Sequence, residues 1–149
     1  RNFNEIEEKD MSALDRQIEG QHYKNQKIQP IELAYVLGQT PAFCKVAKYA
    51  TRIKDDPVQQ LHKALHCIEL DEELKDYHHL YGKIQDTDLV YKLLSIFTED
   101  ENLHACLMAM HLGDYTQATF YMQDMITIAE EIKGKEGDMI EATKEIENE

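Results

Sequence analysis

Glycine and proline are sparse in this chain and fall where helices are expected to begin and end. The 149 residues contain six glycines and three prolines. The three prolines are Pro30, Pro41 and Pro57. Each suits the first residue of a helix, where the N–H that proline lacks would have no partner inside the helix. Gly38, Gly113 and Gly134 suit helix C-termini. No segment alternates polar and apolar residues as a strand does. We therefore expect an all-α protein, a compact bundle of about six to seven helices.

Capping patterns and apolar spacing place these helices. Thr40 and Asp56 precede prolines as N-caps, and capping-box spacing occurs at Asp56 with Gln59, Thr98 with Glu101, and Asp114 with Gln117. Apolar residues at helical spacing predict the core: Leu61, Leu65, Ile68, Leu103, Leu107, Met110, Met122, Met125, Ile126 and Ala129. We expect helices at 30–37, 41–54, 57–81, 87–97, 99–112, 114–133 and 138–147.

The length and composition predict one domain with polar ends. We expect a polar N-terminal extension at 1–20, a single helical domain at 21–133, and a charged tail or helix at 134–149. Three widely spaced cysteines are typical of reduced thiols in a cytoplasmic protein. No apolar run approaches the roughly 20 residues of a membrane span. The apolar helix from Leu89 to Phe97 favours a homo-oligomer.

Positive charge is concentrated in one part of an acidic chain. The formal net charge is -13, yet residues 21–54 carry six lysines or arginines and one glutamate. Lys45, Lys48, Arg52 and Lys54 fall within ten residues, and no acid interrupts them until Asp55. Such a cluster of cationic side chains attracts anions locally, so we expect a nucleotide or another small polyanionic metabolite as ligand. The acidic balance argues against nucleic acid, whose binding requires many phosphates to be neutralised.

The expected helix at 41–54 arranges these cations on one face. Lys45, Lys48 and Arg52 are spaced i, i+3, i+7, and Tyr49 stands beside them. Arginine offers a planar fork to phosphate oxygens and lysine a mobile point charge, which suits a di- or triphosphate. The alternative is a solvated basic face paired with the acidic helices of the second half.

Four short motifs in this region resemble a known family. They occur in order at compatible spacing: His22-Tyr23, Ile28-Gln29-Pro30-Ile31-Glu32, Lys48-Tyr49-Ala50-Thr51-Arg52 after Phe43, and Leu61-His62-Lys63-Ala64. Together they are similar, over about residues 20–75, to the DUF3310 family of small phage proteins, which includes the nucleotide kinase of T7-type phages that lacks a P-loop. The chain departs from that family at Cys44-Lys45, where a glycine-asparagine pair is common, and from Asp86 onward it has no counterpart.

The resemblance implies a deoxynucleoside monophosphate kinase with ATP as phosphate donor, acting in the cytoplasm of an infected bacterium. The catalytic candidates are His22, Lys48, Arg52 and Lys63, and the nucleotide-binding candidates are Tyr23, Lys45, Lys48, Tyr49 and Arg52. In this hypothesis Arg52 and Lys48 hold phosphates, Lys63 or Lys45 neutralises developing charge, Tyr23 or Tyr49 stacks on the base, and His22 orients a phosphate or moves a proton. The sequence does not specify a requirement for Mg²⁺.

Two other functions remain open. A non-catalytic phage protein could use the same cations to sequester a nucleotide signal, or could use its acidic second half to inhibit a host protein. A MazG-like nucleotide pyrophosphatase would need paired carboxylate motifs, of which only Glu69 and Glu72 match one half. His62, His66, Glu69 and Glu73 share a helix face suited to a divalent metal or to solvent, and we assign no metal site there.

Overall fold

The computed structural model describes residues 12–14, 27–52 and 56–148. These residues form helices and contain no strand, which confirms the all-α prediction. The elements are α1 (Pro30–Leu37), α2 (Pro41–Ala50), α3 (Pro57–Glu73), the 3₁₀ helix η3 (Lys75–Leu80), α4 (Thr87–Phe97), α5 (Glu101–His111) and α6 (Tyr115–Glu147).

Prolines and side-chain caps start these helices as predicted. The three prolines each lie in the first helical positions, at α1, α2 and α3. Thr40 Oγ1 accepts a hydrogen bond from the Phe43 N–H, and Asp56 accepts one from the Val58 N–H. Asp86, Asp100 and Asp114 cap α4, α5 and α6 in the same way, and of these three only Asp114 was predicted. Each cap satisfies a donor that the helix itself leaves unpaired.

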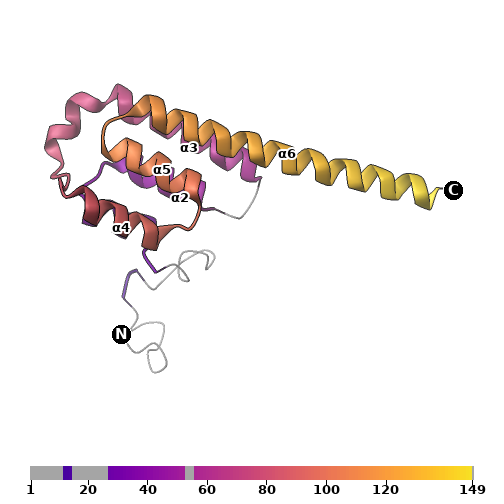
Figure 1. The fold of residues 1–149 in the computed structure, drawn as a ribbon, viewed down its shortest axis with the longest axis horizontal. Coiled ribbons are helices and arrows are strands. Elements are labelled where there is room, and N and C mark those ends of the chain that lie inside the picture. The colour runs from indigo at the N-terminus through magenta and orange to yellow at the C-terminus, as the bar shows by residue number, and fades with distance from the viewer. Residues whose placement is uncertain (1–11, 15–26, 53–55, 149) are drawn as a thin grey trace.

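The helices surround one apolar core. α2 packs on α3, α5 packs on α6, and α3 lies alongside α6, whose C-terminal part continues beyond the bundle (Figure 1). Fully buried side chains come from every α-helix and include Leu33, Phe43, Ile68, Leu94, Leu107 and Met122. Most of the predicted core residues are buried, and Leu65, Met125 and Ala129 are partly buried against the core.

Two predicted helices are shorter than expected. α2 ends at Ala50, where Thr51 Oγ1 donates to the Ala47 carbonyl at 2.8 Å. α3 ends at Glu73, and residues up to Leu80 continue as the 3₁₀ helix. His78 Nε2 reaches Asp71 Oδ1 at 3.1 Å. Seven residues of α-helix would separate the two positions by about 10 Å along the axis, so this contact requires the chain to bend.

The predicted helix ends around Thr98 and Gly134 were wrong. α5 begins at Glu101 with Asp100 as its cap, because Thr98 Oγ1 instead accepts from the Asp100 N–H. α6 runs unbroken through Gly134 for 33 residues. A glycine inside a helix costs about 1 kcal/mol but does not end it unless φ is positive, as it is at Gly38 and Gly113.

None of the described helices, α6 included, combines the length and apolar character needed to cross a bilayer.

A buried carboxylate joins four of these elements. Asp71 on α3 is only 2% exposed and accepts three hydrogen bonds. Thr40 Oγ1 at the start of α2 donates at 2.6 Å, Tyr115 OH at the start of α6 at 2.9 Å, and His78 of η3 at 3.1 Å. Burial and the Asp71 charge raise the pKa of Tyr115, which keeps its hydroxyl protonated and able to donate.

A close backbone contact joins α1 to the segment that follows η3. Gly38 ends α1 with φ +67°, and a Cβ built there would lie 2.0 Å from the Gly82 carbonyl oxygen. The Ile84 N–H donates to the Leu37 carbonyl at 3.1 Å beside it. Gly38 therefore meets two requirements, a left-handed turn and the close approach of a second chain segment.

Gly38→Ala is expected to destabilise the protein by about 3 kcal/mol or more, because it adds a backbone clash to the cost of a left-handed residue. Gly113→Ala is the matched control, since Gly113 has φ +78° but no atom within 4 Å of a built Cβ. It is expected to cost about 1–2 kcal/mol. Urea unfolding of both variants measures the difference, and equal losses would contradict the close contact.

Asp71→Asn is expected to lower the free energy of unfolding by about 2–4 kcal/mol, because the amide NH₂ would face hydroxyl and imidazole donors in a buried site. Tyr115→Phe, which removes one of the donors, is expected to cost about 1–2 kcal/mol. Asp76→Asn on exposed η3 is the control and should change stability by less than about 0.5 kcal/mol. Thermal unfolding at neutral pH distinguishes them, and a neutral Asp71→Asn would rule out the network.

Candidate functional site

A cavity of about 600 Å³ lies between α1, α2 and the segment around Gly82. One part of its wall is apolar and aromatic, formed by Ile31, Tyr35, Leu80 and Tyr81. Another part is polar and cationic, formed by Gln39, Thr40, Cys44, Lys45 and Lys48. Its size falls in the range of small-molecule sites, which combine apolar surface with a few polar groups.

The fold contacts described above create this cavity. Gly38 lies against Gly82, and the Ile84–Leu37 hydrogen bond holds the same segment at the end of α1. Thr40, bonded to Asp71, sets where α2 begins and therefore where its first turns face. Lys45 and Lys48 lie one turn apart on α2, and both are exposed. The cavity thus places two cations beside an aromatic wall.

The thiol of Cys44 is neutral in this setting. Burial raises its pKa above the ordinary value of 9.0, and the opposing attraction of Lys48 and Lys45 is smaller. A cysteine nucleophile or metal ligand acts as the thiolate. Cys44 therefore contributes a small, weakly polar surface to the cavity, and no thiolate competes with an external anion beside the two lysines.

Gln39 is held in place by a buried histidine. Its Nε2 lies 2.9 Å from His111 Nδ1, and His111 Nε2 lies 2.7 Å from the Ile84 carbonyl. Because the carbonyl can only accept, Nε2 carries the proton and Nδ1 accepts from Gln39. Burial lowers the pKa of His111 below its ordinary value of 6.5, which favours this neutral form. The histidine thus connects α5 to Gln39 in the cavity wall and to the segment that follows Gly82.

The residues predicted to form one cationic face lie in two separate sites. Lys45 and Lys48 line the cavity, whereas Tyr49 and Arg52 line a separate groove of about 300 Å³ against α6. Arg52 lies apart because α2 ends at Ala50, so its side chain does not continue the helix face, while Tyr49 lies inside the helix and lines the groove from there. Lys63 Nζ lies 5.8 Å from the centre of the Tyr49 ring, also outside the cavity. His22, Tyr23 and Lys54 are outside the described residues.

Sequence reasoning missed the aromatic side of the cavity. Tyr35 is 83% exposed on α1, and Tyr81 follows η3, 46 positions later in the chain. Tyr35 could have been recognised as a candidate site residue because it is a tyrosine on the polar face of a short helix. Nothing local marks Tyr81, since its place depends on the bend after α3 and on the contact between Gly38 and Gly82.

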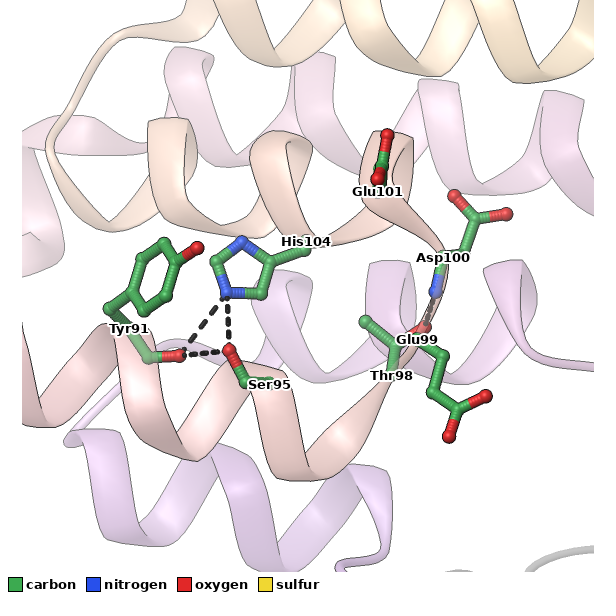
Figure 2. A pocket seen from close by; sticks show the side chains of 7 residues that line it. All are labelled: Tyr91, Ser95, Thr98, Glu99, Asp100, Glu101 and His104. Carbon is green, nitrogen blue, oxygen red and sulfur yellow. Dashed lines mark hydrogen bonds between the residues drawn. The ribbon is translucent and has the colours of Figure 1, made fainter.

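A second pocket, between α4 and α5, is polar and acidic (Figure 2). His104 Nε2 lies 3.1 Å from the Tyr91 carbonyl and 3.2 Å from Ser95 Oγ, while Ser95 Oγ donates to the same carbonyl at 2.9 Å. Because that carbonyl accepts both protons, Nε2 has no lone pair directed at Ser95. The carboxylates of Glu99, Asp100 and Glu101 point away from His104 (Figure 2). This arrangement joins two helices and does not activate a nucleophile.

Two histidines of the α3 stripe lie near glutamate side chains. His62 Nε2 lies 3.8 Å from Glu130 Oε1 on α6, and His66 Nδ1 lies 3.9 Å from Glu69 Oε2. Across the described part of the chain, no three His, Cys, Asp or Glu side chains lie close enough to hold a metal ion. Glu72, which together with Glu69 matches one of the two carboxylate motifs of a MazG-like pyrophosphatase, is exposed on the same helix.

Comparison of the chain with protein-family models, curated proteins and solved structures finds no match in any of the three.

The neutral state of His111 predicts a pH dependence of stability. Its folded-state pKa lies below the unfolded value of about 6.5, so the unfolded chain binds the additional proton first as the pH falls. The free energy of unfolding should therefore decrease as the pH drops below about 6.5. Urea unfolding between pH 7.5 and 5 should give a shallower slope for His111→Asn than for the wild type. His66→Gln, at an exposed position, is the control, and an unchanged slope in His111→Asn would contradict the assignment.

Proposed function

We propose that this protein binds a nucleotide in the cavity between α1, α2 and the segment around Gly82. The observation that carries the proposal is the pairing of two exposed lysines with an aromatic wall in one cavity of about 600 Å³. Lys45 and Lys48 bind the phosphates, and Tyr35 or Tyr81 contacts the base. The chain's net charge of -13 repels anions elsewhere, so a local cationic site gains selectivity from its surroundings.

The motif resemblance extends this proposal to catalysis. A kinase without a P-loop would use lysine and arginine side chains to position ATP and to stabilise the charge that develops on the transferred phosphoryl group. Lys45 and Lys48 are the first candidates for that role. Lys63 and Arg52 lie outside the cavity, beside Tyr49, and would contribute if the second substrate reaches along α2 toward that groove.

Substitution of both cavity lysines tests the binding site. Each lysine-phosphate contact is expected to contribute about 1.5–3 kcal/mol, so Lys45→Gln and Lys48→Gln should each weaken nucleotide binding by about tenfold or more. Isothermal titration with dATP, dTTP and the deoxynucleoside monophosphates measures the affinity. Lys92→Gln is the matched control, because it removes one exposed lysine on α4, outside both the cavity and the groove beside Tyr49, and it should change the affinity by less than about twofold.

The same titrations separate the competing sites and functions. If Lys63→Gln and Arg52→Gln weaken binding while the cavity variants do not, the ligand site is the groove beside Tyr49. Diphosphate formation from ATP and a deoxynucleoside monophosphate supports the kinase. Tight binding with the nucleotide recovered unchanged supports a sequestering protein, and the absence of nucleotide binding contradicts both.

A further inference from the structure

The C-terminal half of α6 forms a helix that the bundle does not cover. From Lys133 to Asn148 every residue is exposed, and the helix projects past the other elements (Figure 1). The span Lys133–Glu147 corresponds to about 22 Å of helix and includes two glycines, which are poor helix formers. An isolated helix of this length is marginal in water, so contact with another molecule would stabilise it.

An apolar stripe with a seven-residue repeat runs along α6, from Met125 to Ile146. Met125, Ile132, Met139 and Ile146 recur at intervals of seven, and Ile128 and Ala142 fall at the intermediate positions. We call Ile128, Ile132, Met139, Ala142 and Ile146 the α6 seam. Met125 is partly buried against the core, whereas Ile132, Met139 and Ile146 are 54%, 71% and 72% exposed. Such a repeat matches the packing of one helix against another in a coiled coil.

Charges beside the seam indicate the kind of partner. Glu131, Asp138 and Glu145 follow one edge at seven-residue spacing, and Glu136 lies on the other edge. In a parallel pair of identical helices Glu131 would face Glu136 of the second copy, and in an antiparallel pair the acidic edge would face itself. Like charges at these positions oppose association. Lys135 takes the intermediate position between Ile132 and Met139, and its long stem can lie across a neighbouring helix.

We propose that the α6 seam docks an amphipathic helix of another protein whose apolar stripe is flanked by lysine or arginine. The apolar residues provide the buried contact, and the acidic edges of α6 select basic flanks and disfavour a second copy of this chain. This surface contributes no residue to the lysine cavity, so nucleotide binding there and helix docking can be tested independently, whereas Ile128 and Ile132 also line the groove beside Tyr49.

A pair of synthetic peptides tests this proposal on the full-length protein. Both are 21 residues long with leucine at positions a and d, one with lysine and the other with glutamate at e and g. Fluorescence anisotropy should show binding of the lysine peptide and at least about tenfold weaker binding of the glutamate peptide. The variant Ile132→Gln/Met139→Gln/Ile146→Gln keeps every charge and should bind the lysine peptide at least about tenfold more weakly.

Ile140→Gln is the matched control. Ile140 is 57% exposed on the same helix but lies about 100° around the axis from the seam, so its replacement should leave the affinity within about twofold. Circular dichroism checks that the triple variant is folded. Equal binding of both peptides, or full binding by the triple variant, would overturn the proposal. A dimer in light scattering that the triple variant abolishes would also overturn it, because a second copy would then occupy the seam.

Discussion

The arrangement of this bundle depends on one buried carboxylate. An isolated charge in a protein interior costs several kcal/mol, and Asp71 offsets that cost only by accepting hydrogen bonds from Thr40, His78 and Tyr115 at once. These donors belong to three different elements, the start of α2, η3 and the start of α6. Since all three must reach the same two oxygens, the carboxylate fixes the relative position of elements that apolar packing alone would allow to slide.

The candidate site follows from this constraint. Thr40 caps α2 and donates to Asp71, so the helix that carries Lys45 and Lys48 starts at a fixed point. The bend that brings His78 to Asp71 also directs the chain toward Gly82, which closes against Gly38. The cavity thus forms where two tight contacts meet, and its lysines are exposed because their helix packs through its opposite face.

The sequence predicted local features well and long-range features poorly. The starts of α1, α2 and α3 were confirmed because proline and capping residues act within one turn. The division of the cationic face could not be predicted, since it depends on where α2 ends and which neighbour each side meets. Tyr81 was missed for the same reason. Gly134 was misinterpreted as a stop because a glycine marks a helix end only where the backbone turns left-handed.

We propose the cavity beside Lys45 and Lys48 as the ligand site. The most direct measurement is a ¹H–¹⁵N NMR titration of the wild-type protein with dATP, following the backbone amides. Binding in this cavity should give saturable shifts concentrated at residues 38–48 and 80–84, with little change near Arg52 or at Met125–Ile132. Shifts concentrated in that second group, or no saturable shifts with any nucleotide, would contradict it.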